Sequence, residues 1–168
     1  MRLIILILLP FLAIFLQSTI FATLSIRETI PDIVLIFVCF FALLNGPERG
    51  MKYGFLCGLL EDIYLGRVIG INALSKAVVA YIVGKLQGIV FKENILVGVL
   101  VTILATLINA LLILLITLIN MKAFGFDHFI LTSIVTQIIY NSVVSIPIYF
   151  WYYNSAYHGW LKDQGVHK

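Results

Sequence analysis

Six apolar stretches, each bounded by a short polar segment, follow one another along the 168-residue chain. They cover residues 3–23, 31–44, 50–65, 71–91, 95–121 and 129–151. A transmembrane helix needs about 20 mostly apolar residues, and connections of only a few residues keep consecutive helices adjacent. The pattern therefore predicts one membrane domain over residues 1–168, a compact bundle of about six transmembrane helices with a short tail at 154–168.

The composition agrees with this all-α integral membrane class. Hydrophobic residues make up 62% of the chain and charged residues 11%, and the mean hydropathy is +1.10. Such a chain has too little polar surface to cover a soluble globule. The net charge of +3 comes from scattered residues, without the basic patch that nucleic acid requires, so nucleic-acid binding is not expected. The first apolar stretch lacks a small-x-small cleavage site and is interpreted as an uncleaved membrane helix.

The positions of Lys and Arg residues predict the orientation in the membrane. With the amino terminus inside, seven of them fall on the cytoplasmic side: Arg2, Arg49, Lys52, Lys85, Lys92, Lys162 and Lys168. Four fall on the outer side: Arg27, Arg67, Lys76 and Lys122. Because cytoplasmic segments carry the excess of positive charge, both termini are expected in the cytoplasm.

Two adjacent carboxylates, Glu61 and Asp62, interrupt the third apolar stretch. An ionised carboxylate near the centre of a span costs about 2.5–3.5 kcal/mol on insertion scales, more than the neighbouring apolar residues offset. The pair must therefore lie near the outer end of its helix, be protonated, or face protein. Adjacent helical side chains diverge by about 100°, so the two do not form an acid/base pair by themselves. A structural polar tie and a contact with a partner or ligand both remain open.

Small and polar residues recur at helical spacing in the later stretches. Helix packing is the favoured interpretation for the glycines, since small residues let helices approach closely. The predicted packing glycines are Gly54, Gly58, Gly66, Gly70, Gly84 and Gly88. The last two helices carry a predicted interior polar seam: Thr102, Thr106, Asn109, Gln137, Tyr140 and Asn141. Hydrogen bonds between helices are its favoured role, and a pocket for a small polar ligand is the alternative.

Residue patterns typical of catalysis or metal binding do not emerge from the sequence. His128, His158 and His167 are not paired at metal-ligand spacing, and no nucleophile-elbow, zinc-protease or phosphate-binding motif occurs. Cys39 and Cys57 fall in apolar stretches, as small buried hydrophobic residues do. The expectation is a protein that is not an enzyme and needs no cofactor or metal.

About a third of the chain resembles the bacterial rod shape-determining protein MreD family. The likeness begins with Pro31 and Asp32 at the start of the second stretch. It continues through the motif Gly-Leu-Leu-x-Asp-x-x-x-Gly-x-x-x-Gly-x-Asn-Ala-Leu over residues 58–74. The motif places Asp62, Gly66, Gly70, Asn72, Ala73 and Leu74 in register. Elsewhere the likeness is one of hydropathy and length.

The resemblance implies a non-catalytic scaffold of the elongasome in the bacterial cytoplasmic membrane, with a fold similar to the substrate-binding subunits of energy-coupling-factor transporters. It implies that the protein binds MreC and, directly or indirectly, the MreB filament and the peptidoglycan synthases, within membrane lipids. It also suggests that Asp62 and Asn72 either cap the turn "GRVIGIN" or present polar groups to MreC.

The chief alternative is the vitamin-binding subunit of an energy-coupling-factor importer, which has the same size and number of spans. Against it, the first helix lacks the Ala-x-x-x-Ala signature for docking, because Ala13 is followed four residues later by Gln17. Copurification of a vitamin would favour this alternative. A lipid-processing membrane enzyme is a third class, held back by the missing catalytic residues.

Overall fold

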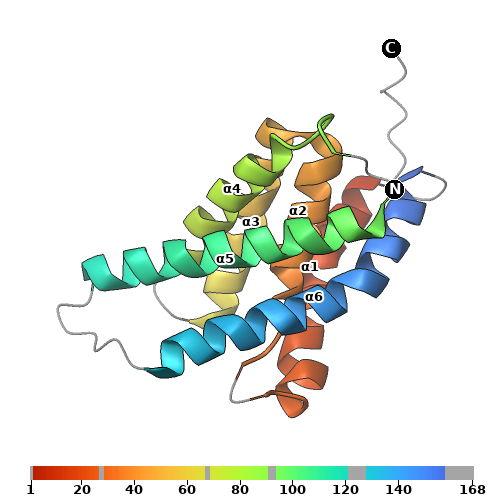
Figure 1. Cartoon of the computed structure of the whole chain (residues 1–168). Helices are drawn as coiled ribbons and strands as arrows, with labels where there is room; N and C mark the ends of the chain where they lie inside the picture. The colour runs from red at the N-terminus through yellow and green to blue at the C-terminus, as the bar shows by residue number, and fades with distance from the viewer. Residues whose placement is uncertain (1, 27–28, 67–68, 91–93, 121–127, 158–168) are drawn as a thin grey trace.

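In the computed structural model, which describes residues 2–26, 29–66, 69–90, 94–120 and 128–157, these ranges form six helices (Figure 1). They are α1 (Arg2–Thr23), α2 (Ile33–Asn45), α3 (Pro47–Leu65), α4 (Ile71–Gly84), α5 (Ile95–Asn120) and α6 (His128–Tyr157). Three of them, α1, α5 and α6, are long and apolar enough to cross a membrane, whereas α2 and α4 are shorter apolar helices. The predicted all-helical architecture is confirmed over the described residues.

Helix α4 ends earlier than predicted. It stops at Gly84 instead of residue 91, and the chain then continues in tight turns closed by bonds between residues three apart, such as Gln87 N–H to Gly84 O at 3.1 Å. Helix α6 is longer than predicted and runs to Tyr157. The first residues of the predicted tail therefore belong to α6, and residues 158–168 lie outside the described part of the chain.

Helix α2 is the core of the bundle. Each of its residues from Ile33 to Leu43 is buried, and all five other helices contact it. A helix that is apolar all round is stable only when it is surrounded on every side, which explains its central place in Figure 1. Helices α5 and α6 pack along each other, and in this view they run across the direction of α2, α3 and α4.

Glycines bring the antiparallel helices α3 and α4 into close contact. A Cβ atom on Gly54 would lie 2.6 Å from the carbonyl oxygen of Lys76, and one on Gly58 would lie 2.7 Å from Cα of Ala73. At the other end of the pair, a Cβ on Gly84 would meet Cα of Pro47 at 2.5 Å. These three glycines have the packing role predicted for them, because any side chain would force the backbones apart.

The packing role predicted for Gly66, Gly70 and Gly88 is wrong. All three have positive φ, at 62°, 108° and 86°, and a Cβ on any of them would meet open space. Gly66 ends α3 in the left-handed conformation, and Gly70 precedes α4. Glycine adopts positive φ at the lowest cost, so these residues shape turns and do not pack helices.

A hydrogen bond between α1 and α3 has a clear cause in the sequence. Pro10 lies inside α1 and has no N–H, so the carbonyl four residues earlier, that of Leu6, lacks its helical partner. The hydroxyl of Tyr53 on α3 donates to this carbonyl oxygen at 2.9 Å. Tyr53 therefore satisfies the group that the proline leaves open.

Replacing Tyr53 with phenylalanine should destabilise the protein by about 0.5–1.5 kcal/mol, because a half-buried carbonyl loses its donor. The midpoint of thermal unfolding in detergent measures this effect. Tyr64→Phe is the matched control, since Tyr64 is exposed on the same helix. Equal midpoints for the two variants would contradict the role given to Tyr53.

Candidate functional site

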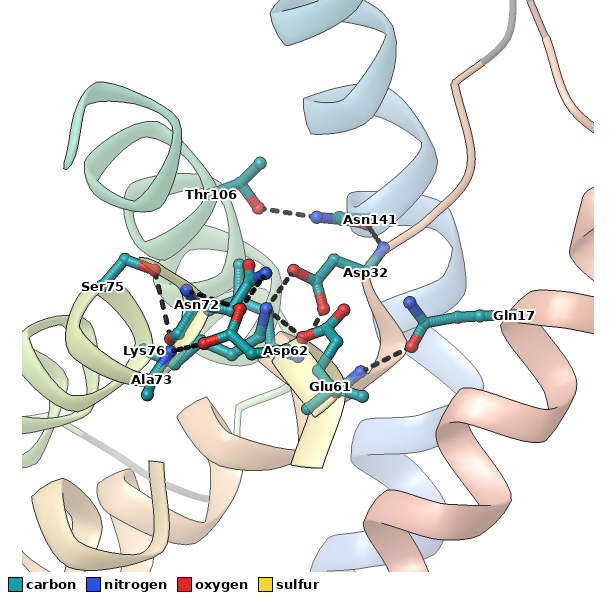
Figure 2. Close-up of polar contacts among 12 residues, drawn as sticks. Gln17, Asp32, Glu61, Asp62, Asn72, Ala73, Ser75, Lys76, Thr106 and Asn141 are labelled. Atoms are coloured by element: carbon teal, nitrogen blue, oxygen red, sulfur yellow. Dashed lines mark hydrogen bonds and ion pairs between the residues drawn. The ribbon is translucent and has the colours of Figure 1, made fainter. Parts of the chain in front are cut away.

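The candidate site is a buried ion cluster formed by Asp32, Glu61 and Lys76 (Figure 2). Lys76 lies in the second turn of α4, and none of its surface is exposed. Its ammonium nitrogen, Nζ, lies 2.8 Å from Oδ2 of Asp32 and 2.6 Å from Oε2 of Glu61. A buried charge is tolerated only when it is paired, and here one cation serves two carboxylates from two other helices.

Asp32 joins α2 to the cluster and to α6. As the N-cap of α2, it accepts a hydrogen bond from the backbone N–H of Leu35 at Oδ1, 2.8 Å away. Its own backbone N–H donates to Oδ1 of Asn141 on α6, also at 2.8 Å. The carboxylate is thus stabilised by the start of a helix and by Lys76 together.

Glu61 is held by side chains of other helices. Its Oε2 lies 2.6 Å from Nζ of Lys76, which forms the ion pair. The other polar side chain beside it is the amide of Gln17 on α1 (Figure 2). Oε1 of that amide accepts from the backbone N–H of Val34 at 3.2 Å. Glu61 therefore lies where α1, α2 and α4 meet α3.

Asp62 lies next to Glu61, but its carboxylate accepts hydrogen bonds from the start of α4. Its Oδ2 accepts from the backbone N–H groups of Gly70 at 2.8 Å and Ala73 at 3.1 Å. Its Oδ1 accepts from both the backbone N–H and the side-chain amide of Asn72, at 3.1 and 2.9 Å. These donors would otherwise be unpaired at the helix start, so Asp62 caps α4 from the end of α3.

The two neighbouring carboxylates thus face protein and point to different partners, as their helical spacing predicted. Of the two roles left open for Asp62 and Asn72, the cap is the one for which the structure gives hydrogen bonds. A contact with a partner protein stays a prediction for these residues and for Glu61.

The predicted polar seam is only partly interior. Thr102, Thr106, Asn109 and Asn141 are buried, and the amide of Asn141 donates to Oγ1 of Thr106 at 2.9 Å, which links α6 to α5. Gln137 is only half-buried. Tyr140, also half-buried, donates its hydroxyl to the carbonyl of Leu24 at the end of α1, outside the seam. These two residues are not in the buried part of the seam: neighbouring side chains on a helix point about 100° apart, so Tyr140 faces the end of α1 while Asn141 faces α5.

Sequence reasoning missed Lys76, which it assigned to an outer connection. Two features could have revealed it: the lysine falls well inside the fourth apolar stretch, and it lies on the same helix face as Ala73 and Ala80, which the structure buries. Gln17 and Asp32 entered the sequence reasoning only as parts of motifs. Their position beside the cluster depends on long-range packing that no local pattern encodes.

The part of the chain that the structure describes contains no group of three or more His, Cys, Asp and Glu residues suited to a metal ion. Cys39 and Cys57 are buried free thiols. Asp32 and Asp62 accept hydrogen bonds from helix starts, and Lys76 pairs with Asp32 and Glu61, so the arrangement chiefly ties helices together. It defines a helical membrane protein whose interior charged side chains are paired with groups of its own helices.

A comparison with protein families makes this class specific. The family model described as rod shape-determining protein MreD matches residues 1–155, and the chain belongs to this family. The match runs from the start of α1 nearly to the end of α6. The family comprises structural membrane proteins of rod-shape determination and is not a known enzyme family. No curated protein and no solved structure matches the chain.

Proposed function

We propose that the protein is a non-catalytic scaffold of the elongasome, which binds MreC and helps couple the MreB cytoskeleton to lateral peptidoglycan synthesis. The observation that carries this proposal is the family match, which spans all six helices. A fold similar to the substrate-binding subunits of energy-coupling-factor transporters is part of the same proposal.

The distribution of polar groups supports a protein that acts through helix contacts within the membrane. The interior charges of Asp32, Glu61, Asp62 and Lys76 are all used in contacts among the protein's own helices. The outer face of α1 is instead a stripe of large apolar side chains: Ile4, Ile7, Leu8, Phe11, Leu12 and Phe15. Such a surface suits lipid tails and the membrane helix of a partner.

The proposed orientation places both termini in the cytoplasm, as the charge bias predicted. Because Lys76 is buried in the bundle, it no longer counts among the residues of the outer connections. This leaves three positive residues outside against seven inside, which strengthens the bias. Several of these residues, including Arg27, Arg67 and Lys122, lie outside the described residues.

Purification from native membranes tests the proposal. The tagged protein is extracted in mild detergent, and mass spectrometry identifies the proteins and small molecules present in near-stoichiometric amounts. Recovery of MreC, together with wall synthases, is the expected result. Untagged membranes processed in parallel are the control. Reproducible absence of MreC would overturn the proposed scaffold.

The vitamin-binding alternative predicts a different outcome of the same purification, namely a pair of ATPases with a bound vitamin. The two threonines of the polar seam argue against a bound vitamin, because their hydroxyl groups already donate hydrogen bonds within α5. Thr102 donates to the carbonyl of Gly98, and Thr106 donates to that of Thr102, each at 2.8 Å within α5. These two side chains have no spare donor for a ligand.

A further inference from the structure

The ion cluster carries an imbalance of charge. If Asp32, Glu61 and Lys76 are all ionised, the group has a net charge of −1, although each residue is at least nine-tenths buried. Asp62 beside it adds another negative charge, and that one is compensated by its hydrogen bonds at the start of α4. The remaining groups that face the cluster are the uncharged side chains of Gln17 and Asn141 and the buried thiols of Cys39 and Cys57.

One bound proton would neutralise the cluster, and the donors indicate where it resides. Asp62 accepts four hydrogen bonds, and Asp32 accepts one from the first turn of α2 besides that of Lys76. Glu61 has no helix start beside it among the residues that the structure describes, and its donors are the ammonium of Lys76, 2.6 Å from Oε2, and the side-chain amide of Gln17. A carboxylate with few donors gains most from protonation.

We propose that the cluster of Asp32, Glu61 and Lys76 is a proton-binding site, in which Glu61 holds one exchangeable proton whose release loosens α1 from the bundle. The proposal gives the three residues a ligand, the proton, in addition to their structural role of joining helices. It requires no partner protein, so it stands or falls independently of the proposed scaffold.

Helix α1 is the element that responds because it is the least constrained neighbour of Glu61. Helices α3 and α4 cannot separate easily, since their backbones meet at Gly54 and Gly58. Helix α1 packs on α2 and α3, and near its end Phe21 contacts the ring of Tyr140 on α6, whereas Gln17 is its polar residue beside Glu61. A glutamate that loses its proton needs water, and the side covered by α1 is where water can enter at the lowest cost.

Infrared spectroscopy of the purified protein in lipid nanodiscs tests the proton directly. At neutral pH the wild type should show the C=O stretching band of a protonated carboxylic acid. The band should be lost in Glu61→Gln, a variant that keeps the shape of the protonated side chain and is therefore expected to fold. The matched control is Glu48→Gln, the same change at an exposed position in the first turn of α3. Absence of the band from the wild type, or its persistence in Glu61→Gln, would overturn the proposal.

The pH dependence of stability and of α1 exchange gives a second test. Above the ordinary titration range of glutamate, the folded protein holds a proton that the unfolded chain has lost, so stability must fall as pH rises. The unfolding midpoint of the wild type should therefore drop between mildly acidic and mildly alkaline buffer, and hydrogen exchange in α1 should increase. Both changes should vanish in Glu61→Gln and persist in Glu48→Gln. Wild-type exchange in α1 that does not change with pH would overturn the link to this helix.

Discussion

Replacing Lys76 with methionine is expected to remove most of the protein from the membrane. The substitution leaves Asp32 and Glu61 buried and facing each other without their shared cation. Breaking a buried ion pair in this way costs about 3–5 kcal/mol, a large share of the roughly 5–15 kcal/mol that stabilises a typical protein. The amount of folded protein, measured by size-exclusion chromatography after detergent extraction, should fall severalfold.

Two further variants show whether charge is the cause. Lys52→Met makes the same change at an exposed position of α3 and should leave the yield unchanged. The triple variant Lys76→Met with Asp32→Asn and Glu61→Gln removes all three ionisable side chains together and should recover much of the loss. If Lys76→Met alone were as abundant as Lys52→Met, the cluster would have no part in stability.

Replacing Asp62 with alanine should have the second largest effect. The change removes the acceptor of four hydrogen bonds, three of them from backbone N–H groups at the start of α4. Each buried donor left unpaired costs about 1–3 kcal/mol. We expect a strongly lowered unfolding midpoint, with Asp62→Asn intermediate because its amide keeps one acceptor oxygen.

The control for Asp62→Ala is Glu48→Ala on the exposed first turn of the same helix. Cells that produce Asp62→Ala or Glu48→Ala can also test the predicted contact with MreC. If Asp62 acts through the partner, capture of MreC should weaken at an unchanged level of the protein. If Asp62 acts only as the cap, the level of the protein itself should fall. An unfolding midpoint and a capture efficiency both equal to wild type would contradict both roles.

The fold was largely predictable because each helix is a local apolar pattern. The predicted start of α5 at residue 95 is confirmed, and the start of α4 at residue 71 is confirmed as well. The end of α4 was harder to predict, since Leu86, Ile89 and Val90 continue the apolar pattern after the helix has stopped. The turn is set by Gly88 and by the contact of Gly84 with Pro47, neither of which hydropathy reveals.

The candidate site was predictable only in part. Glu61 and Asp62 were recognisable because charge is costly at membrane depth, and this argument needs no knowledge of the fold. The same argument applied to Lys76 would have placed it inside, but a lysine close to a helix start is easily assigned to the connection. Its pairing with Asp32 joins residues 44 positions apart and follows from how α2 packs against α4.

The central place of α2 also bears on how the chain is made. A ribosome delivers α2 well before α5 and α6, and the bond between Asp32 and Asn141 joins residues 109 positions apart. The charged cluster, in contrast, is complete once residue 76 has emerged. A nascent chain that has reached the end of α4 can therefore pair its charged side chains early. The apolar face of α2 that α5 and α6 later cover can remain in contact with lipid until these two helices are inserted. During synthesis, the charged contacts can thus form first, and the apolar packing of α2 is completed last.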